Sequence, residues 1–486
     1  MDRVVPVQRL SALLGSTPLP PPAFRALAER LRMLVLDGQL LDGVRLPSER
    51  DLSQQLQLSR TTVAAAYALL RDRGVLTARR GAGNYLTVPN TAVMSALMPS
   101  PTAARPDGVI GLTCASSAAP PGVAAAYARA LDRLPSLLSG TGYFPDGLPS
   151  LRESLAAQYA ARGLPTDPDQ LIITSGALSA LNIVGRYLLN RGDRAVLESP
   201  TYSNAITALQ RAGARMVGLP VGEDGTDHDQ GALEHLLRQS TPRLAYLMPD
   251  FHNPTGALMD DDTRSVVARA LTRAGTVPVV DETLAALPLD DPANPSTATM
   301  PAPFAVHSSR TLTLGSASKA YWGGLRVGWI RAPRALIGKL VDARVSLDLG
   351  AAPVEQLVLA DLIGQGDAVL TGVRQSLRSR RDHLLGELAR MLPDWTTTSP
   401  AGGLCLWIRL PEPTARALAA AAERRGVLVT PGPPFHVGSG GERHLRLPFT
   451  ASEDLISEAV RRLAAAYDDV RRGASTRDAP AFELSA

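Results

Sequence analysis

Lys319 lies in a setting that suits covalent chemistry. Residues 315–324 read GSASKAYWGG, with the lysine between small residues. Of the 50 basic residues only Lys319 and Lys339 are lysines, and the others are arginines. A lysine amine can lose its proton and condense with an aldehyde to form a Schiff base, whereas a guanidinium stays protonated and is a poor nucleophile. The lysine at 319 therefore indicates a carbonyl ligand, although a lone lysine is more often a surface residue.

A carboxylate for the same chemistry is found upstream. A pyridoxal cofactor acts as an electron sink when its ring nitrogen is held protonated, usually by a carboxylate. The apolar run TVPVVDE (276–282) predicts a strand that ends at Asp281. The carboxyl end of such a strand faces the crevice where ligands bind in α/β sheets. Asp281 is thus the predicted partner of the ring nitrogen, and a helix cap is the alternative for this residue.

A phosphate group would need donors, and three segments supply them. The run LIITSGALSALNIVG (171–185) passes from a predicted strand into a helix through Ser175, Gly176 and Ala177. Backbone N–H groups at a helix N-terminus bind anions. Ser316 and Arg326, three residues before and seven after the lysine, add a hydroxyl and a charged fork for the same phosphate.

Two further residues suit the cofactor ring. In ESPTYSNA (198–205), Tyr202 follows a predicted strand and could stack on a pyridine; the alternative is a core tyrosine. In FHNPTG (251–256), Asn253 has an amide able to bond the phenolic oxygen; the alternative is an ordinary turn. These residues together, in this order, indicate a pyridoxal 5′-phosphate pocket.

The elements that must position this pocket follow from hydrophobic patterning. Apolar runs alternate with alanine-rich helical segments after residue 108, which predicts a mainly parallel α/β sheet. Late runs such as LCLWIRL (404–410) and HLRLPF (444–449) predict a smaller α+β subdomain. The expected division is an N-terminal tail (1–18), a compact domain (19–90), a linker (91–108), the α/β domain (109–472) and a mobile C-terminal tail (473–486).

The compact N-terminal domain has the features of a DNA-binding domain, here named the reader. Residues 1–90 contain 12 arginines against 7 acidic residues, so the basic surplus of the chain lies there. An apolar face over residues 24–35 predicts a first helix. Ser48 and Ser59 are positioned to cap two further short helices, and Arg60, Thr61 and Thr62 open the last one, as in a recognition helix. GVLTARRGAGNYLTV (74–88) predicts a hairpin wing in which Arg79 and Arg80 approach the DNA backbone or the minor groove.

The segment from Leu46 to Leu86 closely resembles the winged helix-turn-helix domain of GntR-type bacterial regulators. The resemblance implies double-stranded operator DNA as a partner. The DNA contacts that it implies are Arg45, Ser48, Arg50, Ser59, Arg60, Thr61, Thr62 and Gly83.

Residues 109–472 resemble fold-type I aminotransferases through YFPDGLPSLR, SGALSAL, ESPTY, HNPTG, VVDE, SASK, GLRVGW and LRLPF. The resemblance implies Lys319 as the Schiff-base lysine, Asp281 on the ring nitrogen and Asn253 on the phenolic oxygen. It further implies Tyr202 stacked on the ring, and Arg446 as the ligand of an effector carboxylate. The phosphate site that it implies consists of Ser175, Gly176, Ala177, Ser316 and Arg326.

One departure from that family concerns catalysis. Many relatives have a tyrosine shortly after the aspartate, whereas here Glu282, Thr283 and Leu284 follow Asp281. Thr283 is the candidate to supply a hydroxyl to the cofactor instead. The loss predicts weak transamination at most.

The combination resembles MocR-type regulators, which include PdxR-like and GabR-like proteins. It implies a cytoplasmic, nucleoid-associated bacterial homodimer, with each reader placed against the partner chain in a domain-swapped arrangement. The function implied is regulation of transcription, with pyridoxal phosphate or an amino compound sensed through an aldimine at Lys319. Two alternatives are an active aminotransferase that carries a DNA-binding domain, and a regulator that has lost its cofactor.

Composition limits other classes. No run of about 18 strongly apolar residues is present, so no membrane span is expected. Cys114 and Cys405 are far apart in sequence without a Cys/His cluster, which argues against structural zinc and favours two buried thiols.

Overall fold

The computed structural model describes residues 4–15, 19–36, 40, 44–72, 75–79, 83–86, 108–222, 229–289 and 300–472. These residues divide into two compact units. The first is drawn from Met1–Thr113, Arg416–Leu428 and Ala465–Ala486, and the second from Cys114–Ala415 and Val429–Ala464. The predicted linker, apart from Gly108, and the predicted C-terminal tail lie outside the described residues.

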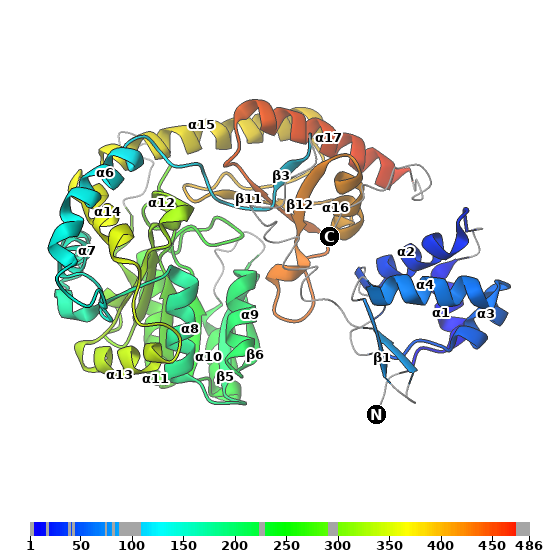
Figure 1. The fold of residues 1–486 in the computed structure, drawn as a ribbon, viewed down its shortest axis with the longest axis horizontal. Helices are drawn as coiled ribbons and strands as arrows, with labels where there is room; N and C mark the ends of the chain where they lie inside the picture. The colour runs from blue at the N-terminus through cyan, green and yellow to red at the C-terminus, as the bar shows by residue number, and fades with distance from the viewer. Residues whose placement is uncertain are drawn as a thin grey trace. The chain divides into compact units, whose positions relative to one another are not determined.

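Four helices and a hairpin form the N-terminal part of the first unit (Figure 1). Their bounds are α1 (Val7–Leu14), α2 (Ala23–Leu36), α3 (Glu49–Leu56), α4 (Arg60–Asp72), β1 (Leu76–Arg79) and β2 (Gly83–Leu86). Leu27, Leu31 and Leu34 of α2 are buried as their spacing predicts, and they share one core with Val63 and Leu70 of α4. The predicted helical face is therefore confirmed where its side chains are described.

The expected N-terminal tail is wrong for residues 7–14. These residues form α1, and its Leu10 and Leu14 are buried in the same core as α2 and α4. Val7 and Leu13 also pack against this core, and a helix of eight residues depends on such tertiary packing for its stability. The folded N-terminal domain thus begins before residue 19.

Both predicted helix caps of the helix-turn-helix are present. The Ser48 hydroxyl accepts a hydrogen bond from the Asp51 N–H at 3.1 Å and donates to the Asp51 carboxylate at 2.7 Å. The Ser59 hydroxyl accepts from the Thr62 N–H at 3.0 Å. Each cap satisfies a backbone donor that the first turn leaves without a partner, so the two short helices begin where the serines stand.

The second unit is built on a seven-stranded sheet with the order β4-β10-β9-β8-β7-β5-β6. The neighbours from β9 to β6 are parallel, while β10 is antiparallel to both β4 and β9. The strands are β4 (Leu171–Thr174), β5 (Arg194–Ser199), β6 (Arg215–Pro220), β7 (Leu244–Leu247), β8 (Val277–Asp281), β9 (Leu312–Ser316) and β10 (Gly328–Arg331).

Helices cover both faces of this sheet, as the alternation of strands and helices predicts (Figure 1). One core joins the strands to α8 (Ala177–Leu188), α9 (Ser203–Arg211) and α13 (Arg334–Val345). The other core joins them to α10 (Gln230–Ser240) and α11 (Asp261–Arg273). Tyr246 belongs to the first core and its neighbour Leu247 to the second, because successive side chains of a strand point to opposite faces.

The remaining elements of the chain include a smaller antiparallel arrangement and several long helices. In it β13 (His444–Pro448) pairs with β11 (Cys405–Arg409) and with β12 (Val427–Pro431). The helix α15 (Ala368–Met391) lies beside α17 (Glu453–Arg471), where Ser379 donates a hydrogen bond to Glu453 (Figure 1). Other elements are β3 (Ile110–Leu112), α6 (Val123–Arg133), α7 (Pro149–Ala161), α12 (Ala317–Ala320), α14 (Pro353–Gly364) and α16 (Ala415–Arg424).

The predicted boundary at residue 109 differs from the division seen in the structure. The strand β3 and most of α16 group with the first unit, where the Ile110 N–H donates a hydrogen bond to the Gly426 carbonyl at 2.8 Å. These segments are distant in sequence, so a boundary drawn from local composition could not separate them.

Candidate functional site

Lys319 lies on the short helix α12, directly after β9. Its Nζ donates a hydrogen bond to the carbonyl oxygen of Ala115 at 2.8 Å. Burial lowers the pKa of the Lys319 amine; the nearby Cys114 thiol opposes this effect, and the positive charge of Arg446 adds to it. A lowered pKa increases the fraction of neutral amine, which is the form that attacks an aldehyde.

Asp281 ends β8 and is held by two donors. Its Oδ2 accepts a hydrogen bond from the Tyr246 hydroxyl at 2.7 Å, and its Oδ1 accepts from the Thr283 N–H at 2.9 Å. Burial raises the pKa of Asp281, although the hydrogen bonds from Thr283 and Tyr246 act in the opposite direction. Such a fixed carboxylate at the end of a strand can hold a protonated ring nitrogen.

Tyr246 is a site residue that the sequence reasoning missed. It lies on β7 opposite Val279 of β8, which places its side chain on the same face as Asp281. The available signal was a buried tyrosine inside an apolar strand, a position where its hydroxyl needs a partner.

The three positions after Asp281 hold no tyrosine, and one of them is a buried leucine. Leu284 stands at the third position after the aspartate and is 7% exposed. Thr283 contacts Asp281 through its backbone N–H. A contact from its hydroxyl to a cofactor therefore remains a prediction.

The turn from β4 into α8 forms a tight cradle. The Arg326 guanidinium donates a hydrogen bond to the Ser175 carbonyl at 3.0 Å. Gly176 has φ +102°, and a Cβ on it would stand 2.9 Å from the Arg326 Nη2. A Cβ on Gly328 would stand 2.5 Å from the backbone of Gly176. Only glycines fit at these two positions, and they leave the first N–H groups of α8, from Ala177 onward, beside a guanidinium.

The Ser316 side chain caps the helix that carries the lysine. Its hydroxyl accepts a hydrogen bond from the Ser318 N–H at 3.2 Å and contacts the Val327 carbonyl at 3.4 Å. Ser316 thus positions α12, and its predicted contact to a phosphate remains a prediction.

Arg446 on β13 contacts Asn253, which lies in the loop that follows β7. The Arg446 Nη1 donates a hydrogen bond to the Asn253 Oδ1 at 3.3 Å, and its guanidinium lies 4.9 Å from the centre of the Phe435 ring. Arg446 is 5% exposed. A buried guanidinium held against an aromatic ring is well placed to bind a carboxylate beside the lysine.

Tyr202 precedes α9 at the same edge of the sheet. Its hydroxyl accepts a hydrogen bond from the Asn204 side chain at 2.9 Å. Burial raises the pKa of Tyr202, and the negative charge of Asp281 contributes to the same shift. The tyrosine therefore lies within electrostatic range of the aspartate, as a ring that stacks on the cofactor would require.

The two cysteines differ from each other. Cys405 is buried, as expected, but Cys114 is exposed, so the expectation of two buried thiols is wrong for Cys114. The residue lies in the coil that leads from β3 to α6, next to the carbonyl group that binds Lys319. Both thiols influence the pKa of Lys319 and are therefore near the site.

A common geometry explains why these residues converge. The strands β4, β5, β7, β8 and β9 all point in one direction. Ser175, Tyr202, Asn253, Asp281 and Lys319 each follow or end one of them. The carboxyl ends of parallel strands form one edge of the sheet, which is where α/β proteins bind ligands. The lysine, the carboxylate, the glycine cradle and the helix N-terminus fit pyridoxal 5′-phosphate.

The predicted DNA-contacting residues lie at the start of α4 and before it. Arg60 and Thr61 are exposed in the first turn of α4, and Ser59 is hydrogen-bonded to the hydroxyls of Thr61 and Thr62 at 2.7 Å each. Ser48 and Arg50 are exposed at the start of α3. The exposed hydroxyls and the arginines are available for base edges and phosphates.

The wing is joined to the segment before α3. A Cβ on Gly83, which has φ +105°, would stand 2.8 Å from the Arg45 Nε, so Arg45 lies directly against the wing. The hairpin β1-β2 pairs Leu76 with Leu86 and Thr77 with Tyr85, as its sequence predicts. Arg80 and the side chain of Arg79 lie outside the described residues.

Comparisons with known proteins agree with both halves of this description. The family "Aminotransferase class I and II" matches residues 123–463, and the family "Bacterial regulatory proteins, gntR family" matches residues 24–86. No helix among the described residues is long and apolar enough to cross a membrane.

Three similar proteins illustrate the relationship. The HTH-type transcriptional regulator YisV of Bacillus subtilis is 28% identical over 93% of this chain and 96% of its own length. The probable rhizopine catabolism regulatory protein MocR of Rhizobium meliloti is 31% identical over 77% of this chain and 79% of its own. The structure of the α-aminoadipate aminotransferase LysN of Thermus thermophilus, complexed with N-(5′-phosphopyridoxyl)-L-leucine, covers 75% of this chain and 94% of its own, with 32% identity and a TM-score of 0.67.

Proposed function

Because the chain belongs to the MocR-type regulators, in which a GntR helix-turn-helix domain is joined to an aminotransferase class I and II domain, we propose that it is a transcription regulator that senses a ligand at Lys319. The ligand is pyridoxal 5′-phosphate itself or an amino compound that reacts with it. The observation that carries the proposal is Lys319: a partly buried amine of lowered pKa at the same sheet edge as Asp281, in a chain that also has a recognition helix.

The second unit supplies the residues that bind the cofactor. Pyridoxal phosphate supplies an aldehyde for an amine and a ring that withdraws electrons. Lys319 would bind the aldehyde carbon, Asp281 would face the ring nitrogen, and the cradle around Gly176 and Arg326 would hold the phosphate. Tyr202 would cover the ring, and Asn253 would face the phenolic oxygen.

Arg446 defines the chemical class of the effector. Its guanidinium is buried and contacts Asn253, which would face the bound cofactor. An amino acid would bring its carboxylate to Arg446 and its amine toward the carbon bound by Lys319. An amine without a carboxylate would lose the charged contact, so amino acids are the preferred effectors.

Sensing is favoured over turnover by the residues after Asp281. The three residues that follow Asp281 are Glu282, Thr283 and Leu284, so the tyrosine that many related enzymes have shortly after the aspartate is absent from these positions. The alternative, an active aminotransferase that carries a DNA-binding domain, is favoured by the 34% identity to the 2-aminoadipate transaminase of Thermus thermophilus over 63% of this chain. The rate of transamination distinguishes these functions, since repeated turnover would support the enzyme.

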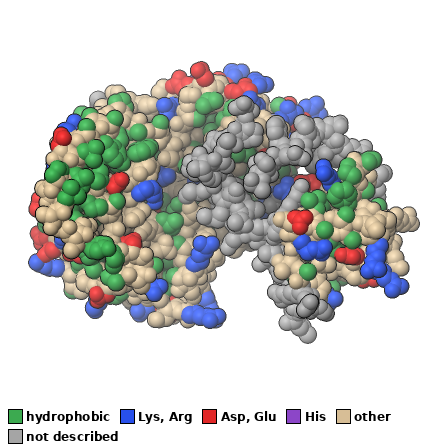
Figure 2. Space-filling view, viewed as in Figure 1, with side chains coloured by type: hydrophobic (Ala, Val, Ile, Leu, Met, Phe, Trp, Pro, Cys, Tyr) green, Lys and Arg blue, Asp and Glu red, His purple; other side chains and the backbone are tan. Residues whose placement is uncertain are grey.

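A homodimer through the second unit would give the regulator two DNA readers. Large hydrophobic residues exposed on this unit include Leu131, Leu138, Tyr143, Val345 and Leu347. Figure 2 shows hydrophobic side chains gathered on the side of this unit where Figure 1 places α6, α7 and α14. Apolar surface of this kind marks a protein interface. In such a dimer, the two DNA-binding domains would match two operator half-sites. The protein would act in the cytoplasm, where the bacterial chromosome lies.

Coupling between the ligand and the operator is tested by a joint titration. Purified protein is mixed with a labelled fragment of its own promoter region, and pyridoxal phosphate is added with and without amino acids. Absorbance near the Schiff-base band reports attachment at Lys319, and fluorescence anisotropy reports DNA binding. The proposal expects the DNA affinity to change as the absorbance saturates, because the ligand binds two states differently.

Linkage makes the test reciprocal. If the ligand changes the affinity for operator DNA by some factor, the operator must change the affinity for the ligand by the same factor. Covalent binding without any change in DNA affinity would contradict the sensor. Multiple turnovers with an amino donor and a keto acceptor, together with constant DNA affinity, would establish the enzyme instead.

A further inference from the structure

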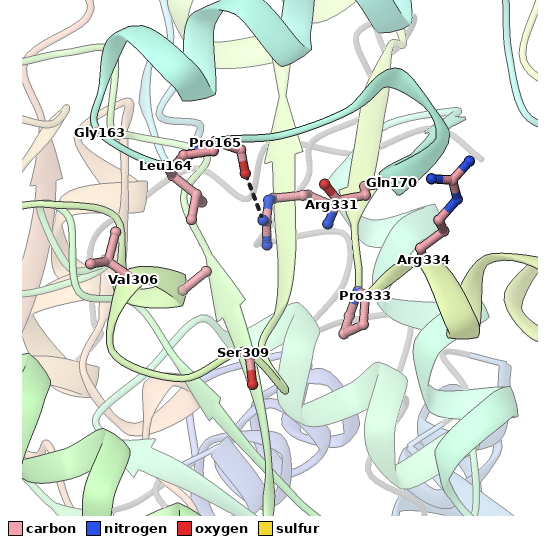
Figure 3. A pocket seen from close by; sticks show the side chains of 10 residues that line it. Gly163, Leu164, Pro165, Gln170, Val306, Ser309, Arg331, Pro333 and Arg334 are labelled. Atoms are coloured by element: carbon pink, nitrogen blue, oxygen red, sulfur yellow. Dashed lines mark hydrogen bonds between the residues drawn. The ribbon is translucent and has the colours of Figure 1, made fainter.

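A cavity lies near the amino ends of the parallel strands of the large sheet, whereas Lys319 lies at their carboxyl ends. It has a volume of about 480 Å³ and is lined by Gly163, Leu164, Pro165, Gln170, Ala305, Val306, Ser309, Arg331, Pro333 and Arg334 (Figure 3). Arg331 ends β10, whereas Gly328 at the start of the same strand touches the Gly176 cradle. The cavity is therefore separate from the pocket of the cofactor.

Arg331 brings a buried charge to this cavity. The residue is 7% exposed, and burial lowers its pKa. Its Nε donates a hydrogen bond to the Thr166 hydroxyl at 2.9 Å, and its Nη2 donates to the Pro165 carbonyl at 3.5 Å. Both acceptors are neutral, and no carboxylate among the described residues lies within ion-pair distance of this guanidinium.

Three other buried arginines of the same unit have a carboxylate partner. Arg264, Arg344 and Arg381 each have an aspartate oxygen at 2.5–2.8 Å. A guanidinium taken out of water needs an anionic partner to offset its desolvation, and these three have one within the chain. Arg331 lines a cavity instead, which is where a bound anion would serve as its partner.

The surrounding groups limit the charge of that anion. Arg334 at the rim is paired with Asp169, so this pair adds little net charge. Glu282 acts on Arg331 only over a longer distance, and its own carboxylate contacts Arg162 at 2.9 Å. Helix α13 begins directly after Pro333, and the backbone N–H groups of its first turn add a partial positive charge near the cavity. The cavity thus offers about one positive charge.

The remaining lining is mostly apolar. Leu164, Pro165, Ala305, Val306 and Pro333 supply hydrocarbon surface, while Gln170 and Ser309 supply polar groups (Figure 3). Small-molecule sites commonly combine such apolar walls with a few polar groups, at volumes of roughly 300–1,000 Å³. We propose that this cavity binds a small organic anion, with one carboxylate or phosphate group against Arg331 and an apolar body against the hydrocarbon lining.

Calorimetric titration of the full chain tests this site. The protein is first saturated with pyridoxal phosphate, so that the cradle at Gly176 is filled, and is kept in a buffer free of carboxylate and phosphate. Benzoate, phenyl phosphate and inorganic phosphate are the probes. We expect saturable binding of benzoate or phenyl phosphate, and the stronger of the two identifies the anionic group. Inorganic phosphate should bind more weakly because it has no apolar body.

Three variants locate the binding. Arg331→Gln should weaken it at least about tenfold, because a charged hydrogen bond is lost. Ser309→Trp changes an exposed lining residue and should block the cavity while Arg331 and the fold remain. Arg310→Gln removes an exposed arginine that is not in the lining, and it should leave the affinity unchanged.

Several results would overturn the proposal. These are the absence of saturable binding of both organic probes in the millimolar range, or equal affinity in Ser309→Trp and the unchanged protein. The Ser309→Trp result decides the case even if Arg331→Gln fails to fold.

Discussion

At the scale of single residues, Lys319 and Asp281 are the two groups that the chemistry cannot replace. One is an amine whose pKa is lowered by burial, and the other is a carboxylate whose pKa is raised by burial. Each residue is therefore shifted toward its neutral form before a ligand arrives. A cofactor with an aldehyde and a cationic ring nitrogen suits this pair, because it reacts with the neutral amine and its positive charge offsets the effect of burial on the carboxylate.

Replacement of the lysine separates attachment from folding. Lys319→Ala should abolish the Schiff-base absorbance after incubation with pyridoxal phosphate and leave the circular dichroism spectrum unchanged. Lys339→Ala is the matched control, since Lys339 is the other lysine of the sequence and is exposed on α13. An unchanged absorbance band in Lys319→Ala would mean that the aldehyde reacts elsewhere.

Burial raises the pKa of Asp281, and the hydrogen bond from Tyr246 partly opposes this rise. In Tyr246→Phe a donor to the ionised carboxylate is lost, so the pKa of Asp281, which burial already raises, should rise further. Since the folded state then holds this proton to higher pH, the loss of stability should be present at neutral pH and shrink as the pH falls through that pKa. We expect a loss of about 1–3 kcal/mol near neutral pH.

Urea unfolding of the cofactor-free protein at neutral and acidic pH measures this effect. Tyr187→Phe is the control, because Tyr187 packs against the same core at a distance from the strand ends. Equal losses at both pH values would show that the Tyr246 hydroxyl acts through packing alone.

At the scale of elements, short-range patterning predicts some features and long-range contacts decide others. The apolar runs predict β4, β5, β7, β8 and β9, because a buried strand in a parallel sheet is apolar on both faces. The strand β10, with the sequence GWIR, is too short to stand out, and it exists because it pairs with β4 on one side and β9 on the other.

The same distinction applies to the site. Asp281, Asn253 and Lys319 could be predicted because each follows a strand or stands in a local motif. The contact between Tyr246 and Asp281 joins residues that are 35 positions apart, and the hydrogen bond from Lys319 to Ala115 spans 204 positions. No local pattern specifies such pairs. They depend on which strands become neighbours in the sheet.

The cradle between β4 and α8 offers a test at this scale. In Gly328→Ala, the new methyl group would stand 2.5 Å from the backbone of Gly176, which cannot move without shifting the start of α8. We expect a loss of about 1–3 kcal/mol in stability and a weaker affinity for pyridoxal phosphate. Gly338→Ala in α13 adds a methyl group in open space and should be neutral or stabilising by up to about 1 kcal/mol. Equal cofactor affinity in both variants would contradict the cradle.

At the scale of the whole molecule, DNA binding and the proposed ligand binding belong to different parts of the chain. The basic surplus lies in residues 1–90, while the remaining residues sum to a charge of −1. The net electrostatic attraction to DNA is therefore expected to come mainly from the reader. Under the proposed function, a ligand would change operator binding by changing how the readers are presented.

Arg60 tests the reader directly. Its side chain is exposed in the first turn of α4, beside the hydroxyls of Ser59 and Thr61. Arg60→Ala should weaken binding to the protein's own promoter region. If Arg60 contacts a phosphate, the affinity falls for all sequences and the slope of log affinity against log salt decreases by about 1. If it contacts a base, the loss is about 1–3 kcal/mol and is confined to specific DNA.

Arg9→Ala is the matched control, because Arg9 is exposed on α1 of the same unit, away from α4 in sequence. Mobility-shift titrations at two salt concentrations, with promoter and unrelated DNA, separate the outcomes. The Schiff-base absorbance of Arg60→Ala should match that of the unchanged protein, since the pocket at Lys319 lies in the other unit. Unaltered mobility shifts at moderate salt would show that α4 is not the recognition helix.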